Sequence, residues 1–146
     1  MTNSVIQRVV VAVDGSEGSQ RATALAAELA ELHQAPLRLV HVLPVSHYDQ
    51  HGALGISAEA LAEVRKKAGQ DAFAAVEAAT AGCHQPIERS ALMGDVAETL
   101  IDVLGDDPQT LLVMGRRGQS GLKSLLLGSV SDKVVRHTCS PVTLVN

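Results

Sequence analysis

The residues best suited to chemistry lie in the last third of the chain, where glycines flank two arginines. Residues 114–118 read MGRRG, and after nine further residues a Gly-Ser pair follows at 128–129. Glycine has no Cβ, so Gly115 and Gly118 can adopt positive φ and let backbone N–H groups approach a ligand. Gly128 and Ser129 open a predicted helix, whose first N–H groups attract an anion. The spacing therefore predicts a loop that binds phosphates.

Other nucleotide motifs are absent. The chain has no G-x-x-x-x-G-K-S/T segment, which excludes a P-loop ATPase, and residues 14–18 read DGSEG, which does not match the dinucleotide fingerprint G-x-G-x-x-G. Ser16, Ser19 and Ser129 have no neighbouring sequence signal for a nucleophile and its base. We therefore predict a binding site and assign no catalytic residue.

Five apolar segments that must position this loop are predicted to be strands. The first is nearly continuous and β-branched, as in a strand buried on both faces of a parallel sheet. The third is interrupted by Glu88, Arg89 and Ser90, which suits an edge strand. The predicted strands are residues 5–13, 37–42, 86–92, 110–114 and 141–145.

Helical patterns alternate with these strands. Ser57 and Asp95 are predicted N-caps of the second and third helices, with Glu98 at the capping-box position, and the fourth helix spans about 129–137. The apolar stripes of the first two helices are Ala22, Leu25, Leu29 and Leu32, and then Leu61, Val64, Ala68, Ala72, Ala75 and Ala79.

This alternation predicts an α/β fold with a single domain over residues 1–146. We expect a doubly wound open sheet of five mostly parallel strands in the order 3-2-1-4-5, with helices on both faces. Ligands of such sheets bind beyond the carboxyl ends of the strands, where the strand order reverses. The loops after the first and fourth strands should flank that crevice, and the irregular segment 44–56 could hang over it.

Composition excludes several classes of partner. The net charge of −4 and the presence of only two aromatic residues, Tyr48 and Phe73, argue against nucleic acid. No apolar run approaches the ~20 residues of a membrane span, and no signal peptide precedes the first strand, so we expect no membrane contact and a cytoplasmic location. Cys83 and Cys139 lack C-x-x-C spacing and are expected to be ordinary thiols.

The glycine spacing, in this context, resembles the ATP-binding subgroup of the universal stress protein family. The resemblance covers the whole chain: VVVAVDGSE at 9–17, HV at 41–42, G-x2-G-x9-G-S at 115–129 within MGRRG and LGSV, and SPVTLV at 140–145. It implies an adenine-nucleotide alpha-hydrolase-like fold. It also implies a homodimer, because the family commonly pairs the final strands of two subunits, and here residues 141–145 form an uncharged edge strand.

The resemblance further implies which residues meet an adenine nucleotide (ATP, ADP or AMP), often accompanied by a divalent ion such as Mg²⁺ or Mn²⁺. The two positions between Gly115 and Gly118 vary in the family, and both are arginine here. The adenosine would contact Ala12, Val13, Asp14 and Val42, the ribose side would contact Met114 and Gly115, and the phosphates would contact Arg117, Gly118, Gly128, Ser129 and Val130.

Two of these residues also have purely structural interpretations. Asp14 could serve only as the turn residue that helps to cap the first helix. Ser129 could be the N-cap of the last helix, with Asp132 three positions on forming a capping box, while still facing the anion site.

Several histidines and a basic run receive structural interpretations. His47 and His51 bracket Asp49, but no fixed element sets a metal geometry there, so we expect a solvated loop. His41 is expected to be a packed or hydrogen-bonded core histidine, and the run at 65–67 a solvated helix face.

Three functions compete. The first is a nucleotide-dependent stress-response or signalling regulator with slow or no hydrolysis and with protein partners still to be identified. The second is an ATPase or autophosphorylating enzyme on the same fold, although the HIGH-type and SGGxDS-type signatures of related enzymes are absent after the first strand. The third is an interaction module that has lost its ligand, for which a broken glycine loop is expected and an intact one is found.

Overall fold

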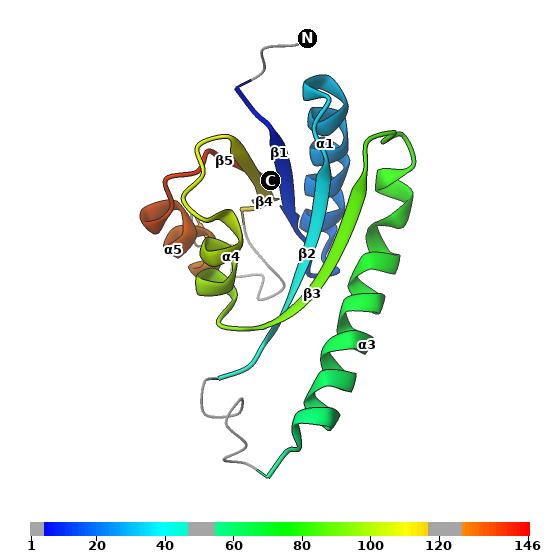
Figure 1. Ribbon diagram of the computed structural model, residues 1–146, viewed down its shortest axis with the longest axis vertical. Coiled ribbons are helices and arrows are strands. Elements are labelled where there is room, and N and C mark those ends of the chain that lie inside the picture. Colours follow the sequence, from blue (N-terminus) through cyan, green and yellow to red (C-terminus); the bar gives the residue numbers. More distant parts are fainter. Residues whose placement is uncertain (1–4, 47–54, 117–126) are drawn as a thin grey trace.

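A five-stranded parallel sheet forms the centre of the molecule (Figure 1). The computed structural model describes residues 5–46, 55–116 and 127–146. Adjacent strands pair in the order β3-β2-β1-β4-β5, and every pair is parallel. The predicted doubly wound fold and its strand order are therefore confirmed. The strands are β1 (Arg8–Ala12), β2 (Leu37–Pro44), β3 (Ile87–Gly94), β4 (Thr110–Gly115) and β5 (Val142–Val145).

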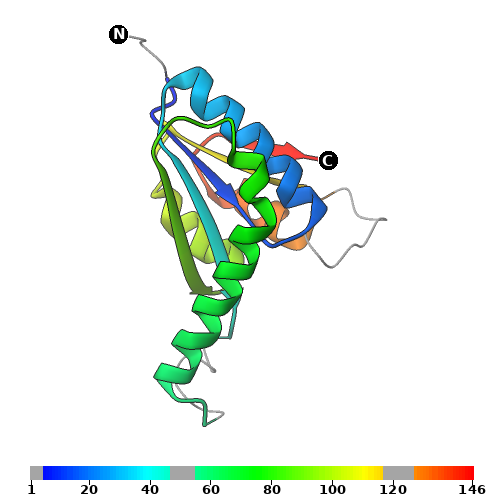
Figure 2. The same ribbon diagram turned by 90° about the vertical axis from the view of Figure 1, so that its right-hand side faces the viewer.

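Helices cover both faces of the sheet (Figure 2). Helices α1 (Glu17–His33) and α3 (Ala58–Val76), which continues into the 3-10 turn η1 (Glu77–Thr80), pack on one face. Helices α4 (Val96–Leu104) and α5 (Ser129–His137) pack on the other. The side chains of β1 alternate between the two layers, Val9 and Val11 towards α1 and Val10 towards α4. No helix in the described ranges is long and apolar enough to cross a membrane.

Small side chains, rather than leucines, form the buried face of α1. Ala22, Ala26 and Ala30 are fully buried at i, i+4 and i+8, whereas Leu32 is 73% exposed. Leu25 and Leu29 only flank the core. The predicted leucine stripe is therefore wrong at its C-terminal end, because the alanine face lets the helix lie closer to the sheet. In α3 the same correction applies to Val64, which is 53% exposed.

The predicted caps of α3 and α4 are confirmed. The Ser57 Oγ accepts a hydrogen bond from the Ala60 N–H at 3.1 Å, and the Asp95 Oδ1 accepts one from the Glu98 N–H at 2.9 Å. The Glu98 carboxylate bonds to the Lys133 ammonium, 3.2 Å away on α5. This contact joins the two helices that cover one side of the candidate site.

Candidate functional site

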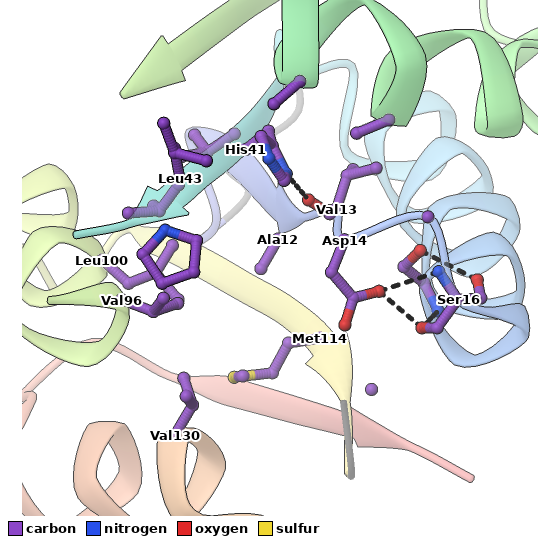
Figure 3. Close-up of a pocket in the computed structure, with 18 of the residues that line it drawn as sticks. Ala12, Val13, Asp14, Ser16, His41, Leu43, Val96, Leu100, Met114 and Val130 are labelled. Atoms are coloured by element: carbon purple, nitrogen blue, oxygen red, sulfur yellow. Dashed lines mark hydrogen bonds between the residues drawn. The ribbon is translucent and has the colours of Figure 1, made fainter. Parts of the chain in front are cut away.

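A cavity of about 650 Å³ opens at the carboxyl ends of β1, β2 and β4 (Figure 3). These ends meet where the chain winds from β1 to β2 in one direction and to β4 in the other, the usual ligand position in such folds. Arg117 and Gly118 lie outside the described residues. All the other predicted site residues line the cavity: Ala12, Val13, Asp14, Val42, Met114, Gly115, Gly128, Ser129 and Val130.

Asp14 organises the turn between β1 and α1. Gly15 has a φ of 82°, which favours glycine. The Asp14 Oδ1 accepts hydrogen bonds from the Ser16 N–H at 2.9 Å and from the Ser16 hydroxyl at 2.5 Å (Figure 3). Ser16 is the N-cap of α1, and its Oγ accepts from the Ser19 N–H at 3.1 Å. Asp14 thus has the predicted turn role and holds its carboxylate at the cavity wall.

The end of β2 presents backbone groups to the cavity. The last bond from β1 to β2 runs from the Val13 N–H to the Val40 oxygen at 2.8 Å. Alternate residues of a strand direct their N–H and C=O to the same side, so Val42 shares the orientation of Val40. Because the pairing of β1 with β2 ends at Ala12 and Val40, the Val42 N–H and C=O have no strand partner among the described residues. They form a donor and acceptor pair at the cavity wall.

The His41 side chain bridges β2 and the residue after β1 where the two strands separate. Its Nδ1 lies 2.7 Å from the Val13 oxygen (Figure 3). A carbonyl only accepts hydrogen bonds, so Nδ1 carries a proton in this contact. The predicted hydrogen bond is confirmed, but His41 is half-buried and is not part of the core as predicted.

Ser131 and Arg116 hold the two ends of the glycine-rich segment together. The Gly128 N–H donates to the Arg116 oxygen at 2.9 Å. The Ser131 hydroxyl, in a residue only 2% exposed, lies 2.9 Å from the same oxygen and 3.1 Å from the Gly115 oxygen. Ser131 was missed in the sequence, although it stands three positions before the buried Val134 and therefore on the buried helix face.

The predicted span of α5, residues 129–137, is confirmed, but its N-cap differs from the structural interpretation of Ser129. Gly128, not Ser129, is the N-cap, with φ −69° and ψ 162°, and no side chain of the described residues caps the helix. The bond from Gly128 to Arg116 fixes the extended conformation at 128, so the N-cap lies one residue earlier than Ser129. Asp132 pairs with Arg136 at 3.0 Å instead of forming a capping box. The N–H groups of the first helical turn therefore lack intrahelical acceptors at the cavity wall.

The remaining walls are mostly apolar. They come from Ala68, Ala72 and Ala75 of α3 and from Val96 and Leu100 of α4, with Asp71 of α3 as a carboxylate among them. Such walls suit a flat ring rather than a charged group.

Metal donors are sparse in the described part of the chain. There, no three His, Cys, Asp or Glu side chains gather closely enough to hold an ion. His47, Asp49 and His51, with most of the segment expected to hang over the crevice, lie outside the described residues. The Nε of Arg116 is buried and has no hydrogen-bond partner among those residues, an arrangement that costs free energy unless a further group supplies an acceptor.

The open doubly wound sheet, with a cavity where its strand order reverses, defines the class of α/β proteins that bind small ligands at that place. Residues 6–146 match the universal stress protein family, and the chain belongs to it. It is 30% identical to Universal stress protein MJ0531 of Methanocaldococcus jannaschii over 142 residues, which covers 97% of this chain and 83% of that protein.

Two solved structures are similar over almost the whole chain. Hypothetical protein MJ0577 aligns with a TM-score of 0.76 at 19% identity and covers 97% of this chain and 96% of its own, which supports the fold. A universal stress protein in complex with cAMP aligns with a TM-score of 0.68 at 28% identity, covering 98% of this chain and 99% of its own.

Proposed function

We propose that this protein binds an adenine nucleotide, with ATP as the first candidate, and acts as a nucleotide-dependent stress-response or signalling regulator with slow or no hydrolysis. The observation that carries the proposal is the cavity itself. Its mostly apolar walls lie between the Val42 backbone pair and the first N–H groups of α5, which have no intrahelical acceptor. A ligand with a flat base at one end and phosphates at the other matches both.

The base would lie at the end of β2. The amino group and the neighbouring ring nitrogen of adenine form a donor and acceptor pair that complements the Val42 C=O and N–H. Ala12 and Val13 would supply apolar contacts beside it, and the Asp14 carboxylate can accept from a ribose hydroxyl. Met114 and Gly115 lie on the same wall, on the side where the ribose joins the phosphates.

The phosphates would lie at the start of α5, where the helix dipole and the first N–H groups favour negative charge. Gly128, Ser129 and Val130 belong to this wall, and Arg117 and Gly118 would complete it. Mg²⁺ or Mn²⁺ would be held mainly by the phosphate oxygens, because Mg²⁺ typically takes one or two carboxylates beside phosphates and waters. Asp14 and Asp71 are the carboxylates in the described cavity lining, and Asp71 already pairs with Lys67 at 2.9 Å.

A family member solved with cAMP supports an adenine nucleotide as the ligand class. The same proposal includes a cytoplasmic location, one functional domain over residues 1–146, and a homodimer that pairs β5 with its copy. All four residues of β5 are only half-buried at the sheet edge, as an interface strand requires.

Two measurements test the binding. Mass spectrometry of natively purified protein should detect retained nucleotide, and calorimetry should show ATP binding to protein freed of it. Gly128→Val should abolish binding, since its backbone conformation accepts any residue while the new side chain fills the phosphate position. Gly82→Val is the matched control, because a Cβ there meets nothing within 4 Å. Unchanged ATP affinity in folded Gly128→Val would refute the site.

Turnover distinguishes a regulator from an enzyme. Under saturating ATP with Mg²⁺, we expect phosphate release far below the ~1 s⁻¹ that is the lower end of typical kcat values of kinases. A rate at or above that level would instead establish the ATPase alternative.

A further inference from the structure

The outer edge of β3 is open. Along β2, the Leu37 and Val45 N–H groups donate to the Pro86 and Gly94 oxygens at 2.9 and 3.2 Å. Because backbone direction alternates along a strand, even-numbered residues of β3 face β2, and Arg89 and Ala91 direct their N–H and C=O outward. In the described sheet β3 is terminal, so no strand pairs with these outward groups. In Figure 1 the edge lies beside α3.

A hollow of about 390 Å³ lies beside this edge, between β3 and α3. Its floor is fixed by close packing: a Cβ added at Gly69 would lie 2.6 Å from the Ala91 Cβ, so glycine permits the contact. Phe73, which packs partly against the core, gives the hollow an aromatic surface. The remaining lining residues are Ala62, Glu63, Arg65, Lys66, Gln70, Arg89 and Ala91.

The hollow is basic although the chain carries a net charge of −4. Arg65, Lys66 and Arg89 stand against the single carboxylate of Glu63. None of the three cations has an ion pair within the described ranges, whereas the adjacent Lys67 pairs with Asp71 at 2.9 Å. The basic run of α3 thus divides: Lys67 is neutralised on its own helix, and its neighbours join Arg89 from another element.

We propose that the β3 edge and this hollow form a docking site for an extended, acidic segment of a protein partner. The segment adds to β3 as a further strand, through the outward N–H and C=O groups of Arg89 and Ala91. Side chains on the α3 side then place carboxylates near the three cations and an apolar group on Phe73. A second copy of this net-negative chain is a poor match, and single-stranded nucleic acid would need more stacking surface than Phe73 offers.

A fluorescein-labelled peptide, Glu-Thr-Val-Thr-Glu-Thr, tests the charge and the pattern, because its Glu and Val side chains lie on one face of a strand. Fluorescence anisotropy should show that it binds, that added salt weakens it, and that the Lys-for-Glu peptide does not bind. Arg89→Glu should weaken binding roughly tenfold, since reversal replaces an exposed attraction by a repulsion. Lys67→Glu, one helix position from the hollow, should leave the affinity near that of the unmodified protein.

Further measurements decide between a strand and a simple charge contact. The same peptide N-methylated at every amide should lose binding, because strand addition requires main-chain donors. Circular dichroism checks that the variants fold. Absence of binding by the acidic peptide, equal effects of Arg89→Glu and Lys67→Glu, full binding by the N-methylated peptide, or equal binding of an oligothymidylate of the same charge would each overturn the proposal.

Discussion

Removing the Ser131 hydroxyl tests whether the anchored ends of the glycine-rich segment serve ligand binding. The hydroxyl has one hydrogen to share between the Arg116 and Gly115 oxygens, at 2.9 and 3.1 Å. Ser131→Ala therefore loses one buried hydrogen bond, but the Arg116 oxygen keeps its bond from the Gly128 N–H. The expected loss of unfolding free energy is about 1–2 kcal/mol. With an unfolding entropy of about 2.1 cal/mol/K per residue, this lowers Tm by about 3–7 °C.

The same change should weaken ATP binding. In the variant, the ligand must supply about 1 kcal/mol that the Ser131 hydroxyl otherwise supplies to hold the two ends of the segment together. The affinity for ATP should then fall about 3- to 10-fold. Ser140→Ala is the matched control: Ser140 is also buried, and its hydroxyl donates to the Asp107 oxygen at 2.8 Å, away from the cavity lining. Calorimetry and thermal unfolding should show similar Tm losses but a loss of affinity only for Ser131→Ala. Unchanged ATP affinity in both variants would refute the reasoning.

Further predictions concern phosphate reading, acid stability and assembly. By calorimetry, Arg117→Ala should weaken the binding of ATP more than that of AMP, because Arg117 is expected to form a charge-assisted bond of about 1.5–3 kcal/mol with the outer phosphates. Equal losses of affinity for the two nucleotides would contradict this. A hydrogen bond from the His84 N–H lowers the pKa of Glu31 below its ordinary value of 4.5. The ionised Glu31 side chain therefore stabilises the folded state above pH 4.5, and this stabilisation is lost as the pH falls through the lowered pKa. The Tm difference between the unmodified protein and Glu31→Gln should thus vanish in acid; a constant difference contradicts this. Leu144→Lys should give monomers or insoluble protein, and a 15.3 kDa mass for the unmodified protein by light scattering would refute the dimer.

Much of the fold could be predicted because strand patterns and turn chemistry are local. The β-branched run before Asp14 and the breaks at Glu88 and Arg89 indicated a central strand and an edge strand, and the sheet has both. Ser57 and Asp95 were found as caps because a cap depends on residues within one helical turn. The site residues outside 117–126 converge because these local elements all end at one edge of the sheet.

The wrong predictions concern features that are determined by a contact with an element distant in the sequence. Leu32 fits an apolar stripe, but the sheet selects the alanine face of α1, since small side chains permit closer packing. Ser129 fits an N-cap, but the bond between Gly128 and Arg116 makes Gly128 the N-cap, one residue earlier. Spacing along one helix contains neither contact. The role of Ser131 was equally hidden, because its acceptors lie fifteen and sixteen positions away.

His41 shows how a side chain can create a backbone binding site. If the ladder between β1 and β2 continued regularly, the next bond would run from the Val42 N–H to the Val13 oxygen. The His41 Nδ1 occupies that acceptor at 2.7 Å. The Val13 oxygen therefore stays satisfied while the strands separate, and the Val42 N–H remains available beside its own C=O. A buried carbonyl left without a donor would cost about 1–3 kcal/mol, so the histidine removes the penalty that would otherwise oppose opening the sheet at the cavity.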